Sequence, residues 1–250
     1  MEHPLSGKVV LVTGASRGIG YFVARECGRR GAHVIALART VGGLEELDDE
    51  IRAAGGEAAT LVPLDLTDFD GIDRLGQAVF DRWGRLDGLV GNAGILGPVS
   101  PVAHVDPKDF DRVLAVNVTA NYRLIRSFDL PLRQSGAGRA VFLSSGVVTR
   151  AQPYWGPYTA SKAALEAVVR TYAAEMKATP VRVNVFNPGP LRTAMRAQGW
   201  PGEDPMSLPH PEVVAGPIAD LLSPAVEQTG MLIDFRTGVT RPLAPPDTRL

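Results

Sequence analysis

Short runs of apolar and often β-branched residues alternate with longer amphipathic stretches along the whole chain. Continuous apolar runs of this kind are typical of strands buried on both faces, as in a parallel sheet. The predicted strands are Lys8–Val12, His33–Leu37, Ala58–Val62, Leu86–Val90, Arg139–Leu143, Val181–Phe186 and Met231–Asp234. The stretches between these runs are predicted to be helices.

Capping residues, glycine and proline mark where several of these helices begin and end. The clearest predicted helices are Gly18–Arg30, Phe69–Trp83, a long one from Pro107 to about Arg133, and Pro157–Lys177. Gly31 closes the first as a C-terminal glycine. Thr67 and Asp70 form a capping pair at the second, and Asp106 is the N-cap before the proline that opens the third.

The alternation of strands and helices predicts right-handed βαβ units. We therefore expect an α/β fold: a single Rossmann-type domain over residues 1–250, with a doubly wound parallel sheet of about seven strands and helices on both faces. No internal repeat or linker interrupts it. The proline-rich stretches are predicted to be a loop, Pro201–Pro211, and a C-terminal tail over residues 242–250.

Charge and composition argue against a nucleic-acid-binding, membrane-spanning or metal-binding protein. Lys and Arg total 26 against 27 Asp and Glu, so no net charge favours nucleic acid or an anionic membrane surface. No apolar run approaches the roughly 18 residues that span a bilayer, and the start lacks the pattern of a signal peptide. The one cysteine and four scattered histidines predict neither a disulfide nor a metal site. We expect a cytoplasmic protein.

A glycine-rich segment, Thr13–Gly20, joins the first predicted strand to the first helix. Glycines permit the tight turn, and the helix N-terminus offers free N–H groups and a positive dipole to a phosphate. The segment TGASRGIG is similar to the cofactor signature of the classical short-chain dehydrogenase/reductase family, and the resemblance extends over nearly the whole chain. It implies that the cofactor contacts Gly14, Ser16, Arg17, Gly18, Ile19 and Gly20.

The end of the second predicted strand favours NADP(H) over NAD(H). Ala38 stands where dinucleotide-binding folds often place an acidic residue that holds the ribose 2′-hydroxyl. Arg39 follows it, and Arg17 lies in the glycine loop. Two guanidinium groups and no carboxylate suit a 2′-phosphate. The alternative is that both arginines are solvated surface residues.

Three further segments resemble cofactor-binding parts of the family. After the third strand, Asp65 and Leu66 would hold the adenine. In Gly91–Gly94, after the fourth strand, Asn92, Ala93 and Gly94 match the family, whereas Gly91 replaces an asparagine. After the sixth strand, Pro188, Gly189 and Thr193 would hold the nicotinamide carboxamide. The resemblance thus places cofactor contacts after most of the predicted strands.

Tyr158 and Lys162 form a Y-x-x-x-K pair whose spacing puts both side chains on one face of a helix. A free tyrosine has a pKa of about 10, and a nearby ammonium group lowers it. The pair therefore predicts a general acid/base that exchanges a proton with a carbonyl or alcohol oxygen.

Two further catalytic residues follow from the resemblance. The family's catalytic serine selects Ser145, although spacing alone does not separate it from Ser144. Asn117 matches the residue that distorts a helix and holds a water beside Lys162, which completes a proton relay. The alternatives are a turn serine and a buried structural asparagine.

The predicted function is an NADP(H)-dependent oxidoreductase acting on a small carbonyl or secondary alcohol substrate, and a homodimer or homotetramer is expected from the resemblance. Apolar residues of three loops are expected to line the substrate pocket: Ile95, Leu96, Val147, Tyr154, Trp155, Met195 and Trp200. Arg150, Arg192 and Arg196 would instead suit an anionic group. Two other functions stay open: an NAD-dependent alcohol or polyol dehydrogenase, and a nucleotide-sensing protein without catalysis.

Overall fold

A sheet of eight strands forms the centre of the protein, with strand order β3-β2-β1-β4-β5-β6-β7-β8. The computed structural model describes residues 4–150 and 152–243. The strands are β1 (Val9–Thr13), β2 (His33–Ala38), β3 (Thr60–Pro63), β4 (Gly88–Gly91), β5 (Arg139–Leu143), β6 (Arg182–Asn187), β7 (Met231–Asp234) and β8 (Val239–Pro242). The first seven run parallel, so the doubly wound Rossmann-type prediction is confirmed, with strand ends shifted by one or two residues.

The eighth strand was not predicted. β8 pairs antiparallel with β7, from Met231 opposite Pro242 to Asp234 opposite Val239. Two residues of the tail expected over residues 242–250 belong instead to the folded domain: Pro242 ends β8, and Leu243 is buried. The rest of that tail lies outside the described residues.

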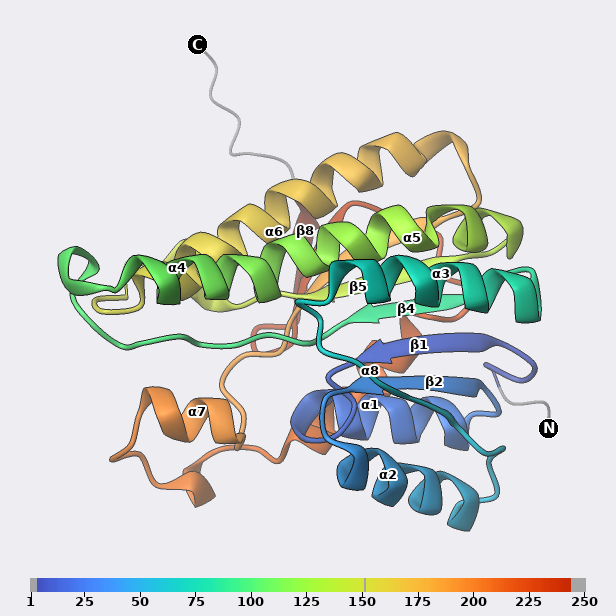
Figure 1. Ribbon diagram of the computed structural model, residues 1–250, viewed down its shortest axis with the longest axis horizontal. Helices are drawn as coiled ribbons and strands as arrows, with labels where there is room; N and C mark the ends of the chain where they lie inside the picture. Colours follow the sequence, from blue (N-terminus) through green and yellow to red (C-terminus); the bar gives the residue numbers. More distant parts are fainter. Residues whose placement is uncertain (1–3, 151, 244–250) are drawn as a thin grey trace.

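Helices cover both faces of the sheet, as Figure 1 shows. They are α1 (Gly18–Arg29), α2 (Val41–Ala53), α3 (Phe69–Trp83), α4 (Pro107–Leu114), α5 (Ala120–Gln134), α6 (Gly156–Glu175), α7 (Ala194–Gly199) and α8 (Ala215–Asp220). Helices α1, α2 and α8 lie on one face, and α3 to α6 lie on the other (Figure 1). In the described part of the chain, no helix is both long and apolar enough to cross a membrane.

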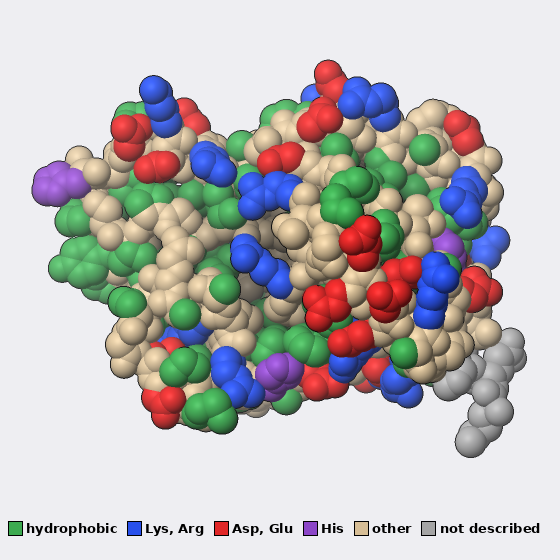
Figure 2. All heavy atoms as spheres, turned by 60° about the horizontal axis from the view of Figure 1, so that its bottom comes forward, with side chains coloured by type: hydrophobic (Ala, Val, Ile, Leu, Met, Phe, Trp, Pro, Cys, Tyr) green, Lys and Arg blue, Asp and Glu red, His purple; other side chains and the backbone are tan. Residues whose placement is uncertain are grey.

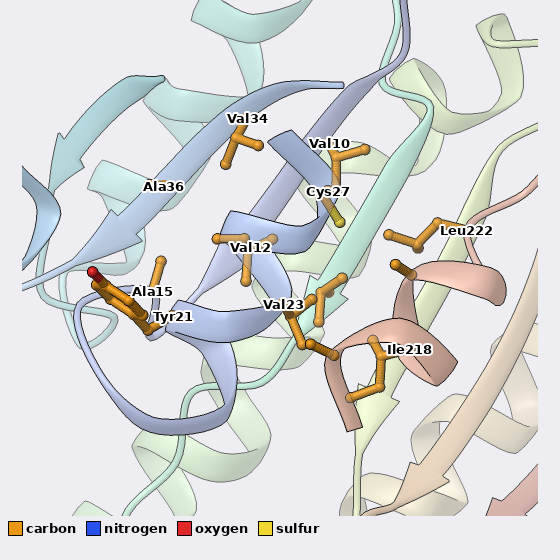
Figure 3. Packing of buried hydrophobic residues seen from close by; sticks show 14 of the residues in the cluster. Val10, Val12, Ala15, Tyr21, Val23, Cys27, Val34, Ala36, Ile218 and Leu222 are labelled. Carbon is orange, nitrogen blue, oxygen red and sulfur yellow. The ribbon is translucent and has the colours of Figure 1, made fainter. Parts of the chain in front are cut away.

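Each face of the sheet packs its own apolar core. Val10 and Val12 of β1 pack with Val34 of β2 against Val23 of α1, and Ile218 of α8 closes this cluster (Figure 3). Cys27, on α1, is fully buried here, and burial raises the pKa of its thiol to about 12. This cysteine is therefore a core residue and not a nucleophile.

Helix ends follow the predicted capping chemistry with one exception. Asp106 accepts a hydrogen bond from the Lys108 N–H at the start of α4, and Gly31 adopts a left-handed conformation after α1. At α3, however, the N-cap is Asp68, which accepts from the Gly71 N–H at 2.8 Å. The predicted Thr67–Asp70 capping pair is wrong, because the Thr67 hydroxyl instead donates to Asp65.

The long helix predicted from Pro107 to about Arg133 is interrupted. A π-helical turn, η2 (Ala115–Thr119), separates α4 from α5. Such a turn contains one extra residue relative to an α-helix and occurs frequently at functional sites. Asn117 lies within it and is fully buried.

Asp87 is a buried charge at the start of β4. Its carboxylate accepts hydrogen bonds from the Val9 N–H at 2.9 Å and the Ser135 hydroxyl at 2.7 Å, and it pairs with Lys8 and Arg85. Burial favours the neutral acid, but these donors and cations outweigh it and hold the pKa of Asp87 below its usual range.

Replacing Asp87 with Asn is expected to lower the free energy of unfolding by about 2 kcal/mol at pH 7, since hydrogen bonds to a charged group are lost. The folded-state pKa of Asp87 is depressed, so its stabilisation is present above pH ~4 and is lost as pH falls through the folded pKa. Urea denaturation at pH 7 and at pH 3 measures this, with Asp49→Asn on the exposed side of α2 as control. A difference in stability that stays constant with pH would contradict the prediction.

Candidate active site

A cleft of about 860 Å³ opens where the parallel strands end at their carboxyl edge. The face drawn in Figure 2 is hollowed near its centre, and Lys and Arg side chains gather beside the hollow. The predicted residues that line the cleft are Gly14, Ser16, Arg17, Gly18, Ile19, Arg39, Asp65, Leu66, Asn92, Ala93, Gly94, Tyr158, Lys162, Pro188 and Thr193. Gly20, Asn117, Ser145 and Gly189 are not part of its lining.

The glycine loop presents the uncapped N-terminus of α1 to the cleft. Arg17 is the N-cap in extended conformation, no side chain caps the helix, and its first turn has no acidic residue. Gly14 and Gly18 have φ of 67° and 60°, which disfavour other residues. A Cβ on Gly20 would overlap the Gly14 carbonyl, so Gly20 permits close packing of the loop on the helix. This geometry fits a phosphate group.

Arg39 and Asp65 meet at the rim of the cleft. The guanidinium of Arg39 lies 3.6 Å from the Asp65 carboxylate, and both side chains are about half exposed. The N–H and hydroxyl of Thr67 donate to Asp65, and with the charge of Arg39 they lower its pKa. Because Ala38 is buried and carries no charge, Arg39 faces no acidic residue at the end of its own strand.

The Gly91–Gly94 segment is tied to the end of β1. The Asn92 amide donates to the Thr13 carbonyl at 2.8 Å, while the Thr13 hydroxyl accepts from the N–H groups of Asn92 and Ala93. Gly91 has no room for a side chain: a Cβ there would overlap the Phe142 ring and lie 2.6 Å from Asn121 Oδ1. The ring of Phe142 and the amide of Asn121 fill this space.

Tyr158 and Lys162 lie on one face of α6, both buried. Lys162 Nζ donates to the Leu143 carbonyl at 2.8 Å and lies 5.7 Å from the centre of the Tyr158 ring. Burial raises the pKa of Tyr158 to about 12, which the Ser145 side chain partly opposes. Burial also lowers the pKa of Lys162 to about 8. The pKa of Tyr158 is therefore shifted in the opposite direction to the one expected, because burial outweighs the hydrogen bond with Ser145.

The two serines after β5 have different partners. The Ser144 hydroxyl donates to Glu166 Oε1 at 2.5 Å and lines the cleft. Ser145 lies beside the Tyr158 phenol, accepts a long hydrogen bond from the Val147 N–H at 3.4 Å, and lines a second cavity of about 130 Å³. The Ser144 proton is thus engaged, whereas Ser145 adjoins the tyrosine.

Asn117 joins three segments around the cleft. Its side-chain amide exchanges two hydrogen bonds with the backbone of Ile95, at 2.8 and 2.9 Å, and donates to the Ser161 hydroxyl. Its backbone carbonyl accepts from the Asn121 amide at 2.8 Å. The distorted helix that the resemblance implied is therefore present as the π-turn, with Asn117 connecting it to α6.

The segment after β6 folds back over the cleft. Asn187, at the end of β6, donates to Asp234 and accepts from the Gly189 N–H, while Gly189 itself has φ of 70°. Thr193 caps α7 by accepting from the Arg196 N–H at 3.2 Å. Gly189 therefore shapes the turn, and Pro188 and Thr193 are the residues that face the cleft.

An apolar cluster lies at the tyrosine end of the cleft. It contains Leu96, Val147, Trp155 and Tyr158, with Met195 and Trp200 packed against them. The rings of Trp155 and Trp200 are 4.2 Å apart, and Arg196 lies over Trp200 while pairing with Glu203. Arg196 is thus neutralised within the protein.

Two of the seven apolar residues expected to line the substrate pocket, Ile95 and Met195, line the cleft. The other five are not part of its lining: Leu96, Val147, Tyr154, Trp155 and Trp200. Tyr154 is 57% exposed and adopts a left-handed backbone with φ of 70°, unusual for an aromatic residue. Arg150 is likewise exposed and outside the lining, whereas Arg192 lines the cleft.

Sequence reasoning missed other lining residues, among them Phe22, Arg112 and His210. Phe22 follows Gly18 by four residues on α1, so helical spacing from the glycine loop could have found it. No pattern marked His210, whose ring contacts Phe22 edge-on at 4.8 Å between ring centres. It reaches the cleft only because the chain folds back after α7.

One cleft brings together the edge of a Rossmann-type sheet, an uncapped glycine loop and a buried Tyr–Lys pair. This combination defines a nucleotide-binding oxidoreductase. The family model described as short chain dehydrogenase matches residues 8–204. The chain belongs to the short-chain dehydrogenase family.

Relatives and solved structures agree with this assignment. The uncharacterized oxidoreductase YciK of Escherichia coli K12 is 37% identical over 237 residues, 94% of each chain. A trihydroxynaphthalene reductase of Colletotrichum orbiculare is 34% identical over 194 residues, 76% of this chain and 67% of that one. A structure from Pseudomonas syringae is 37% identical with a TM-score of 0.90, covering 94% of this chain and 96% of the other. A structure from Shigella flexneri 2a, complexed with NADP, is 36% identical with a TM-score of 0.89, covering 94% and 99%.

Proposed function

We propose that the protein is an NADP(H)-dependent oxidoreductase that transfers hydride between nicotinamide and a carbonyl or secondary alcohol substrate. One observation carries this proposal: a single cleft has two arginines and the uncapped end of α1 along one part, and the buried Tyr158–Lys162 pair along another. A nucleotide-sensing protein would not need that pair. No described residue at the end of β2 offers the carboxylate expected of an NAD-dependent enzyme.

The residues around the glycine loop fit a dinucleotide. The N–H groups at the start of α1 would hold the pyrophosphate, and Arg17 and Arg39 would hold a 2′-phosphate. Asp65 and Leu66 would contact the adenine, while Pro188 and Thr193 would hold the carboxamide. When bound, the cofactor supplies the hydride.

The protein's own residues then handle the proton. Tyr158 donates a proton to the oxygen of a carbonyl that is being reduced, and its high pKa keeps it protonated at neutral pH. Ser145 adjoins Tyr158 and orients the same oxygen by a hydrogen bond. Lys162 supplies positive charge beside the phenol and holds the ribose. Asn117 fixes the loop at Ile95 and the turn of α6 that carries Ser161.

The substrate side favours a flat, apolar carbonyl compound. Ile95 and Met195 line the cleft with apolar side chains. The Trp155 ring packs edge-on against Tyr158 and lies against Trp200, and the arginine over Trp200 is paired with Glu203. The relative named trihydroxynaphthalene reductase agrees with a bicyclic aromatic compound as a substrate class. Arg192 still faces the cleft and would accommodate a single anionic substituent.

A paired titration of the purified protein with NADPH and NADH, read by nicotinamide fluorescence, tests the cofactor assignment. Binding of NADPH is expected to be tighter by at least tenfold, since charge-assisted hydrogen bonds to a phosphate contribute about 1.5–3 kcal/mol. Preference for NADH would overturn the assignment of Arg17 and Arg39. Binding of neither would overturn the enzymatic proposal as a whole.

A second assay compares carbonyl compounds at saturating NADPH. We expect 2-tetralone and 9,10-phenanthrenequinone to be reduced at least tenfold more efficiently than small polar sugars, because an apolar pocket leaves sugar hydroxyls without partners. Efficient turnover of the sugars alone would contradict the aromatic substrate class. No turnover of any compound, with NADPH still bound, would favour a nucleotide-sensing role.

A further inference from the structure

Three side chains on one face of α6, each one helical turn from the next, meet three successive residues at the end of β5. They are Tyr158, Lys162 and Glu166 on the helix, opposite Ser145, Leu143 and Ser144 respectively. Two of these contacts belong to the proposed catalytic group. The third, between Glu166 Oε1 and the Ser144 hydroxyl at 2.5 Å, has no role in that mechanism.

Lys162 needs a counter-charge within the protein. Its side chain is almost fully buried, and its hydrogen bond goes to the neutral Leu143 carbonyl, which does not balance an ammonium charge. Glu166 follows Lys162 by four residues on the same helix face. It is the carboxylate whose charge opposes the effect of burial on the pKa of Lys162.

Behind this face lies the second cavity of about 130 Å³. Glu166 borders it together with Ser145, Asp234 of β7 and Arg241 of β8. The pKa of Glu166 lies above its usual value, because burial outweighs the Ser144 hydroxyl and the charges of Arg241, Lys162 and Arg170. Asp234 is engaged by Asn187 at 2.7 Å, so the carboxylate of this group available to Lys162 is that of Glu166, on the same helix.

We propose that Glu166 is a positioning residue of the reaction: its carboxylate, one helical turn from Lys162 on α6, is the counter-charge of the buried Lys162 ammonium, and its bond to Ser144 holds the end of β5 so that Ser145 stays beside Tyr158. The role in catalysis rests on the proposed function. The effect on Lys162 is measured separately, in the pH dependence of NADPH binding without substrate.

Glu166→Gln, which keeps the shape and can still accept from Ser144, tests the charge. Removing a negative charge disfavours the ammonium form, so the pKa of Lys162 falls. In the pH profile of kcat/KM for NADPH-dependent reduction of 2-tetralone, the fall in activity at high pH (the alkaline limb) is therefore expected to occur about one pH unit lower. The same shift is expected in the pH dependence of NADPH binding, measured by fluorescence without substrate. Glu166→Asp, which retains the charge, is expected to keep the limb within about 0.3 pH unit of wild type. Glu175→Gln, exposed at the end of α6, is the matched control.

The outcomes separate the two proposals. A shifted limb in Glu166→Gln with Glu166→Asp and Glu175→Gln unshifted supports the inference. A uniform loss of activity with both limbs unmoved would mean a merely structural role and overturn it. If wild type binds NADPH but reduces nothing, the proposed function fails, and the binding profiles still decide on Glu166. If Glu166→Gln does not fold, Ser144→Ala is tested instead. This variant removes the hydrogen bond from Ser144 and frees the Glu166 carboxylate to turn toward Arg241. A smaller shift of the alkaline limb to lower pH would support the inference, and no shift would overturn it.

Discussion

Replacing Tyr158 with Phe is expected to lower kcat by about 10²–10⁴-fold, since a positioned general acid contributes a factor of that size and the Tyr158 phenol is the group that adjoins Ser145. The substitution removes one hydroxyl group and keeps the ring in the cluster formed with Trp155. NADPH binding should therefore change by no more than about twofold. Steady-state rates and fluorescence titrations on the same preparation measure both.

Tyr172→Phe is the matched control for this prediction. Tyr172 is a buried tyrosine on the same helix whose hydroxyl donates to Asp129 at 3.0 Å, away from the cleft. Its loss should alter stability and leave kcat nearly unchanged. Turnover retained in Tyr158→Phe would refute the assigned role of the phenol.

Replacing Arg39 with Ala is expected to weaken NADPH binding about 10–100-fold and NADH binding less than about threefold. The guanidinium is half exposed at the rim of the cleft, and its pair with Asp65 is long, at 3.6 Å, so it can turn toward a 2′-phosphate. Charge-assisted hydrogen bonds of this kind contribute about 1.5–3 kcal/mol, which corresponds to that range.

Arg74→Ala is the control for general charge effects. Arg74 is 71% exposed, pairs with Asp68 and does not line the cleft. Both nucleotides should bind this variant as they bind wild type. Equal losses for NADPH and NADH in Arg39→Ala would show that Arg39 serves both cofactors alike and would remove the argument for NADP(H) preference.

Apolar periodicity predicted most of the sheet because its parallel strands are buried on both faces. β5, for example, is buried at every residue and was predicted with its observed bounds. β8 escaped prediction for the opposite reason: all four of its residues are exposed, and it ends in proline. Only its pairing with β7, not any pattern of its own, makes it a strand.

Site residues could be predicted where their spacing within one helix or loop fixes their arrangement. They could not be predicted where contacts between segments distant in the sequence decide which residue reaches the site. Spacing placed Tyr158 and Lys162 on one face, but it could not rank Ser144 against Ser145, since the choice depends on Glu166 reaching across from α6. The pKa of Tyr158 likewise depends on burial by residues far along the chain. Arg39 and Asp65, predicted for separate contacts, turn out to be paired.

The π-turn at Ala115–Thr119 rotates the side chains of α4 relative to those of α5 about the common helix axis. Each residue of an α-helix advances the side-chain direction by about 100°, so one extra residue turns everything before it relative to everything after it by about that angle. Arg112, before the turn, lines the cleft, whereas Leu124 and Phe128 of α5, after it, pack in the core. Deleting one residue here would restore a regular α-helix through this segment. The side chain of Arg112 would then rotate by about 100° relative to α5 and point away from the cleft. The number of residues in this segment is therefore as much a determinant of the site as the identity of Asn117.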